Sequence, residues 1–91
     1  MKIQYTPEFY KLYKKADVRI RNAFDNQIRI FKNQPTHTSL NNHELKEKWS
    51  GYRSIDITAD WRAIYKEVKH GKDAIAYFVA IGIHKKLYSS N

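Results

Sequence analysis

The 91-residue sequence predicts an α+β fold, in which an N-terminal helical hairpin packs on a small antiparallel sheet. Apolar residues recur at helical spacing from about residue 7 to residue 33, and they alternate with polar residues after Gly51. The chain has only two Pro and three Gly and no low-complexity stretch or repeat. We therefore expect one domain over residues 1–91, with the element order β-α-α-β-β-β.

The N-terminal half predicts a short edge strand, Lys2 to Tyr5, followed by two helices. Thr6 can cap the first helix, and Pro7 at its first position loses no needed N–H group. Asp17 can cap the second helix, and Asn33-Gln34-Pro35 ends it. The apolar stripe of the second helix comprises Ile20, Ala23, Phe24, Ile28 and Phe31. We expect the hairpin to span about residues 7 to 33.

The C-terminal half predicts three antiparallel strands that follow one another along the chain. Residues 36–51 are mostly polar without a clear period, so we expect a loop there. A turn at residues 69–72 separates the second and third strands, and residues 85–88 are expected to form about one helical turn. The predicted strands are Tyr52 to Ile57, Trp61 to Val68 and Ala74 to Ile83.

The charge is strongly positive, with 17 Lys and Arg against 9 Asp and Glu, or +8. Residues 1–34 carry +5, residues 35–60 carry −1 and residues 61–91 carry +4. This balance favours a polyanionic partner, most often nucleic acid, or an acidic protein partner. The simpler interpretation is that many small proteins are basic without a specific reason.

Several classes of site are excluded or disfavoured. The chain has no Cys, which excludes disulfides, a thiol nucleophile and Cys-ligated metals. The four His residues lack zinc-ligand spacing, and no Gly-rich phosphate loop or Gly-x-Ser-x-Gly elbow occurs. No signal peptide or membrane-spanning run is evident. We expect a cytoplasmic protein without a metal, a cofactor or a membrane partner.

One set of side chains provides the chemical groups that RNA cleavage without a metal requires. His43, Asp60 and His84 are acid–base groups, Tyr88 follows four residues after His84, and the cations are Arg53, Arg62, Lys85 and Lys86. Such cleavage needs a base for the 2′-OH, an acid for the leaving 5′-oxygen and cations for the phosphate. The alternative interpretation is structural: a lone His at a strand end is most often a surface residue, and Asp60 can simply stabilise a turn.

Three sequence blocks resemble the RelE/ParE superfamily, and they are most similar to its YafQ-like branch of bacterial mRNA interferase toxins. The blocks begin at His43 (HELKEKWSGYR), Ile57 (ITADWRAIYK) and Ile81 (IGIHKKLY). The resemblance implies two helices against an antiparallel sheet, ribosome-dependent cleavage of mRNA, and neutralisation by a cognate antitoxin in an oligomeric complex.

By matching position, the resemblance also implies roles for single residues. His43, Asp60 and His84 are acid–base candidates, Trp61 and Tyr88 are candidates for positioning or stacking on RNA at the catalytic centre, and Arg53 and Arg62 are cation candidates.

Two positions depart from the family pattern. Asp56 stands where the branch often has a second His, and Ala80 stands where wider relatives often have an Arg. Asp56 can act as a replacement base near the substrate, or repel phosphate. Two alternatives therefore stay open beside the nuclease: a ParE-type inhibitor of DNA gyrase, and a weak or inactive relative that only binds antitoxin.

Overall fold

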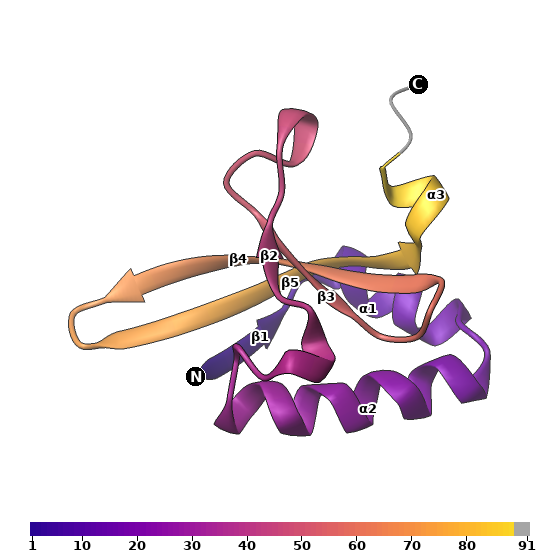
Figure 1. Cartoon of the computed structure of the whole chain (residues 1–91), viewed down its shortest axis with the longest axis horizontal. Helices are drawn as coiled ribbons and strands as arrows, with labels where there is room; N and C mark the ends of the chain where they lie inside the picture. Colours follow the sequence, from indigo (N-terminus) through magenta and orange to yellow (C-terminus); the bar gives the residue numbers. More distant parts are fainter. Residues whose placement is uncertain (89–91) are drawn as a thin grey trace.

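The computed structural model describes residues 1–88. It shows a five-stranded mixed sheet with two helices packed on one face (Figure 1). The strands are β1 (Lys2–Tyr5), β2 (His43–Glu44), β3 (Arg53–Asp56), β4 (Trp61–His70) and β5 (Asp73–Ile83). The helices are α1 (Pro7–Lys15), α2 (Val18–Asn33) and α3 (His84–Leu87), with 3₁₀ turns η1 (Thr38–Leu40) and η2 (Glu47–Trp49). The predicted α+β fold is confirmed.

The helical hairpin begins and turns where the sequence predicts. Thr6 Oγ1 accepts a hydrogen bond from the Phe9 N–H at 3.1 Å, and Pro7 is the first helical residue. Asp17 Oδ1 accepts from the Arg19 N–H at 2.7 Å and caps α2. The end of α1 and the start of α2 lie within three residues of each other, so the two helices fold back on the same face of the sheet.

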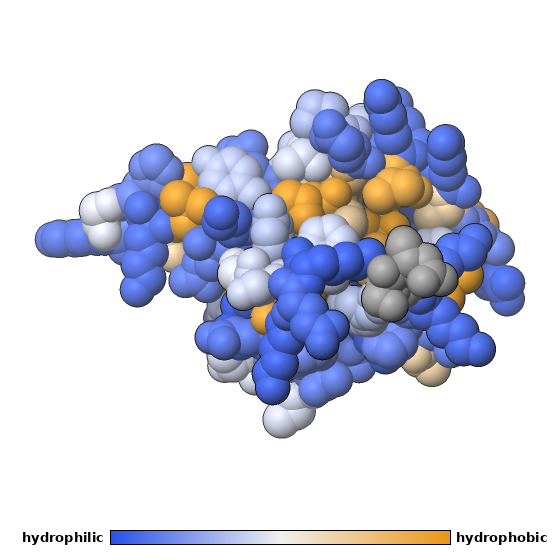
Figure 2. All heavy atoms as spheres, turned by 90° about the horizontal axis from the view of Figure 1, so that it is seen from above, coloured by the Kyte–Doolittle hydropathy of each residue, from blue (hydrophilic) through white to orange (hydrophobic). Residues whose placement is uncertain are grey.

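The strands lie in the spatial order β1-β5-β4-β3-β2. β1 is an edge strand, as predicted, and pairs with β5 in parallel, whereas the other pairs are antiparallel. β4 and β5 extend together beyond their neighbours as a long two-stranded arm (Figure 1). Figure 2, which looks from above, shows this arm covered largely by hydrophilic side chains.

The prediction of a loop over residues 36–51 was wrong in part. This segment holds η1, the two-residue strand β2 and η2. The His37 side chain caps η1 by accepting from the Ser39 N–H, and Leu40 is fully buried. β2 is held by its pairing with Ser54 and Arg53 of β3. Two residues are too few to show a period of two, so these contacts left no pattern in the sequence.

The core lies between the helices and the sheet. Aromatic rings dominate it: Phe31 of α2 contacts Tyr65 of β4 at 5.0 Å and Phe78 of β5 at 5.5 Å between ring centroids. Phe9 and Phe24 continue the cluster toward α1. Among residues 1–88, no helix is both long enough and apolar enough to span a membrane.

Candidate functional site

The face of the sheet away from α1 and α2, here called the open face, carries several polar side chains. Tyr65 contacts α2, so its neighbour Ile64 points to the open face. Ser54 is paired in register with Ile64, and Asp56 with Arg62. Residues paired in register share a face of the sheet, so Ser54, Asp56 and Arg62 all lie on the open face.

α3 brings two further polar residues to this face. Tyr88 Oη donates a hydrogen bond to Ser54 Oγ at 2.8 Å. The His84 ring meets the Tyr88 ring edge to face, with centroids 4.6 Å apart. Ser54, Asp56, Arg62, His84 and Tyr88 are called the Tyr88 cluster below. Burial, above all, raises the pKa of Tyr88, and the Asp56 charge adds to this, while Ser54 and Arg62 oppose it. The phenol is therefore neutral near pH 7.

Three further contacts hold α3 against the sheet. The His84 N–H donates to the Asp60 carbonyl oxygen at 2.7 Å. Trp49 Nε1 donates to the Leu87 carbonyl oxygen at 2.9 Å. A Cβ at Gly82 would lie 3.3 Å from the Leu87 side chain, so this glycine lets Leu87 approach β5 closely. The rings of His84 and Tyr88 thus stand on a turn that is anchored at both ends.

Arg62 is held in place by the backbone around it. Its Nη1 donates to the carbonyl oxygens of Thr58, Ala59 and Trp61 at 2.9, 3.1 and 3.0 Å. Its Nε lies 3.0 Å from Asp56 Oδ1, and the two side chains are 15% and 28% exposed. Asp56 Oδ1 is buried and accepts no well-aligned hydrogen bond within residues 1–88, so the pair is joined by charge rather than by directed bonding.

A cleft beside this cluster brings together five of the predicted site residues. It is lined by Ala59, Asp60, Trp61, Arg62, Ile83, His84 and Lys85. Asp60, His84 and Lys85 are exposed there. Lys86 lines an adjoining apolar groove that Trp61 shares. Acid–base groups, cations and an indole ring therefore face one solvent-accessible cavity.

Two predicted site residues lie apart from this cleft. His43 is exposed on β2, paired in register with Ser54, and its Nδ1 lies 2.8 Å from the Asn41 carbonyl oxygen. Since that carbonyl only accepts, Nδ1 carries the proton and Nε2 is the free nitrogen of the neutral ring. Within residues 1–88, no hydrogen bond or ion pair joins His43 to the Tyr88 cluster.

Arg53 lies on the opposite face of the sheet. It is paired in register with Tyr65, which faces α2. Its Nε donates to Asn42 Oδ1 at 2.8 Å, and its Nη1 lies 3.5 Å from Glu44 Oε1. The structure does not bring this guanidinium to the cleft at His84.

Two residues of this site, Ser54 and Trp49, were not predicted from the sequence. Ser54 is fully buried, and its hydroxyl meets Tyr88. In the sequence, Ser54 stands out only as a polar residue between Arg53 and Ile55. The alternation of side chains along a strand does not tell which face of the strand is covered by helices.

Ala80 is 6% exposed and is paired in register with Ile64, so it lies on the open face. Among residues 1–88, no three His, Asp or Glu side chains are grouped to hold a metal ion.

Comparison with known proteins gives a consistent result. A family model described as "Bacterial toxin of type II toxin-antitoxin system, YafQ" matches residues 1–89. The chain is similar to the crystal structure of YafQ from E. coli strain BL21(DE3), at 27% identity and a TM-score of 0.75, covering 96% of this chain and 97% of that one. The chain is also similar to the crystal structure of the E. coli DinJ–YafQ complex, at 28% identity and a TM-score of 0.73. This match covers 96% of this chain and 97% of that one.

A third solved structure extends the likeness beyond E. coli. The chain is similar to a YoeB/ParE toxin from Agrobacterium tumefaciens at 25% identity, with a TM-score of 0.73 and coverage of 92% of this chain and 99% of that one. The comparison with curated proteins finds no match.

Proposed function

The chain belongs to the YafQ family of bacterial toxins of type II toxin–antitoxin systems, and from that premise we propose that it is an endoribonuclease that cuts mRNA on the ribosome. The observation that carries the proposal is the cleft in which His84, Asp60, Arg62 and Lys85 face one cavity. An imidazole, a carboxylate and two cations supply the groups that metal-independent RNA cleavage needs.

The proposed reaction is a transfer within the RNA strand. A base removes the proton of a 2′-OH, the oxygen attacks the adjacent phosphorus, and the 5′-oxygen leaves with a proton from an acid. His84 and Asp60 are the proton-transfer groups in the cleft, and His43 is the third, from the edge strand. Histidine suits either proton role near neutral pH.

The remaining residues position and stabilise the substrate in this proposal. Arg62, Lys85 and Lys86 offset the charge that develops on the phosphate. Trp61 offers an indole ring on which a base can stack, a contact worth about 1–3 kcal/mol per base. Tyr88, hydrogen-bonded to Ser54, holds its own ring against His84.

The first prediction tests His84. Purified protein added to translating ribosomes should cut mRNA, and His84→Ala should lower the cleavage rate by about 10²–10⁴-fold, the usual size of one lost acid–base group. The readout is primer extension on the mRNA. His70→Ala is the matched control, because His70 is an exposed histidine at the tip of the β4–β5 arm. Uncut mRNA would contradict the nuclease function, and full activity in His84→Ala would contradict the site.

A cognate antitoxin is the proposed protein partner, in an oligomeric complex in the cytoplasm. One similar structure is that of the E. coli DinJ–YafQ toxin–antitoxin complex. With a net charge of +8, this chain fits a partner segment that is acidic or amphipathic and folds as it binds.

The second prediction concerns this partner. The Kd of the complex, measured by calorimetry, should rise as the salt concentration is increased from about 0.05 to 0.5 M. The reason is that salt screens the attraction between the charges of the toxin surface and those of the antitoxin. A Kd that does not change with salt would contradict a charge-driven interface.

A second candidate function is binding of antitoxin without cleavage. The specific observation in its favour is that Asp56 neutralises Arg62 and that Ala80 brings no cation to the open face. Harmless expression without antitoxin, at a normal yield of folded protein, would support it. Gyrase inhibition needs no acid–base set, and a supercoiling assay separates that alternative from both.

A further inference from the structure

A second cleft lies between β1, α1 and α2, and it shares no lining residue with the cleft at His84. Its volume is about 240 Å³. Five aromatic rings and one carboxylate line it: Tyr5, Phe9, Tyr10, Tyr13, Phe24 and Asp25. It is called the tyrosine cleft below.

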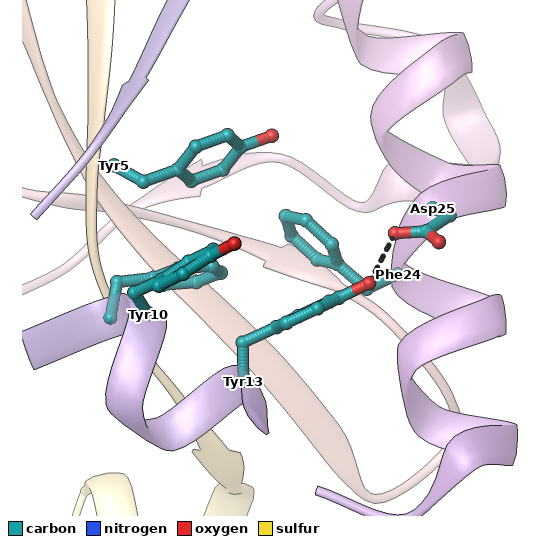
Figure 3. Close-up of a pocket in the computed structure, with 6 residues that line it drawn as sticks. Tyr5, Tyr10, Tyr13, Phe24 and Asp25 are labelled. Atoms are coloured by element: carbon teal, nitrogen blue, oxygen red, sulfur yellow. Dashed lines mark hydrogen bonds between the residues drawn. The ribbon is translucent and has the colours of Figure 1, made fainter. Parts of the chain in front are cut away.

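The aromatic rings form two walls and a floor. Tyr5 stacks on Phe9 with centroids 5.1 Å apart, and Tyr13 stacks on the same ring at 6.3 Å. The edge of Phe24 meets both tyrosines, at 6.1 and 5.8 Å. Tyr5 and Tyr13 therefore share two neighbours, while no ring contact joins them directly within residues 1–88. Figure 3 shows the gap between these rings, with the hydroxyls of Tyr5, Tyr10 and Tyr13 directed toward the side where Asp25 lies.

Asp25 brings a carboxylate to the tyrosine cleft. Tyr13 Oη donates to its Oδ1 at 2.9 Å, and within residues 1–88 the carboxylate forms no ion pair. Arginines lie one turn away on either side, at positions 21 and 29, but both are engaged elsewhere. Arg21 Nη1 donates to the carbonyl oxygens of Lys14 and Ala16, and Arg29 Nη2 donates to Asn26 Oδ1 at 2.6 Å.

Two further observations describe the electrostatics of the cleft. The pKa values of Tyr5 and Tyr13 are raised, first by burial. The Asp25 charge raises the pKa of Tyr5 further, and at Tyr13 the hydrogen bond to Asp25 and its charge do the same, while the Arg21 charge opposes the shift. Lys14 Nζ lies 4.8 Å from the centroid of the Tyr10 ring, so one rim of the cleft already holds a cation from the chain itself.

We propose that the tyrosine cleft binds the guanidinium group of an arginine side chain that a partner peptide presents. The negative faces of the tyrosine rings attract a cation, and a planar guanidinium stacks on such rings while its N–H groups fork onto a carboxylate. A nucleotide fits less well, because its phosphate would approach Asp25. Those charges of the +8 chain that lie farther away than about 8 Å are largely screened at physiological ionic strength. The proposal is independent of the nuclease function.

The test is a titration of the whole ¹⁵N-labelled chain with N-acetyl-arginine methylamide, followed by NMR. Signals of Tyr5, Tyr13 and Asp25 should shift saturably, with a Kd in the millimolar range. The citrulline analogue, which has the same shape without the charge, should bind about tenfold more weakly, the size of one charge-assisted hydrogen bond. The lysine analogue should also bind more weakly, because an ammonium group does not stack.

Variants locate the site. Asp25→Asn keeps an oxygen for the Tyr13 hydroxyl, so the fold should persist, and it should weaken arginine binding by about tenfold. Asp73→Asn makes the same charge change on the β4–β5 arm, where Asp73 pairs with Lys2, and should leave the affinity unchanged. Tyr5→Leu should also weaken binding by removing one wall. Absence of saturable shifts, equal binding of the citrulline or lysine analogue, or unchanged affinity in a folded Asp25→Asn variant would each overturn the proposal.

Discussion

Asp56 decides how much positive charge the Tyr88 cluster offers to a phosphate. Its carboxylate lies 3.0 Å from Arg62 Nε, and both side chains are mostly buried. A neutralised guanidinium attracts an anion less than a free one does. Arg62 also keeps three backbone acceptors, so its position does not depend on Asp56 alone.

The third prediction follows from this pair. Asp56→Asn preserves the size of the side chain and removes its negative charge, so RNA should bind about 3–10-fold more tightly, the equivalent of roughly 1 kcal/mol. Fluorescence anisotropy with a short labelled RNA measures the change, in His84→Ala protein so that the RNA stays intact. Asp73→Asn makes the same change in net charge at the start of β5, the opposite end of that strand from His84, and is the control. Equal gains in the two variants would assign the effect to net charge instead of to Arg62.

The face of the sheet on which a strand residue lies could not be predicted from the sequence alone. Arg53 and Ser54 face opposite ways, because strand side chains alternate. Which of them faces the helices depends on where α2 packs, and that is a tertiary contact. Arg53 was therefore placed among the cations of the site, whereas Ser54, which holds Tyr88, was not. Asp60, Arg62, His84 and Lys85 were predicted as site residues from the sequence, and in the structure they line one cleft, because the β3–β4 turn lies beside the end of β5. Their functional roles stay a prediction.

At the scale of elements, α3 is only four residues long, which is too short for a helix to be stable without tertiary contacts. Its place depends on four residues from four parts of the chain: Trp49 of η2, Ser54 of β3, Asp60 of the β3–β4 turn and Gly82 of β5. The sequence predicted the helical turn but not its anchors. Neither η2 nor the two-residue strand β2 has a periodic pattern, and both form only because the loop closes on the sheet and on α3.

The fourth prediction tests the anchor at Trp49. Trp49→Phe removes the N–H that donates to the Leu87 carbonyl, and it should lower the free energy of unfolding by about 1–2 kcal/mol. Because the same contact positions α3, kcat for mRNA cleavage should fall severalfold with a smaller change in KM. Thr6→Ala is the matched control: it removes the α1 cap at a cost of about 1 kcal/mol, far from α3, and should leave kcat unchanged. Equal activity in the two variants would show that Trp49 serves stability alone.

At the scale of the whole molecule, four tyrosines share a response to alkaline pH. The pKa values of Tyr5, Tyr13, Tyr65 and Tyr88 are all raised, with burial as the largest cause. The folded state therefore keeps these phenol protons at pH values where the unfolded chain loses them. The stability that results is fully present below about pH 10 and is lost as the pH rises through the folded-state values.

The fifth prediction is that the free energy of unfolding, measured in urea titrations, falls as the pH is raised above about 10. Tyr65 is almost fully buried between Phe31 and Phe78, so Tyr65→Phe should reduce the steepness of this fall. The variant should also be less stable near neutral pH, because Asn42 loses its hydrogen bond to the phenol oxygen. An unchanged slope in Tyr65→Phe would remove Tyr65 from the explanation.

The pairing of β1 with β5 has a consequence for how the protein is made. Residues 2–5 find their only strand partner within residues 1–88 in residues 75–78, which the ribosome adds more than 70 residues later. The first strand must therefore wait, unpaired, until almost the whole of this sequence has been translated. Since α3 follows β5 directly, the cleft at His84 is assembled last of all. A ribosome that makes this chain thus holds no finished copy of the cleft while translation of these residues is still under way.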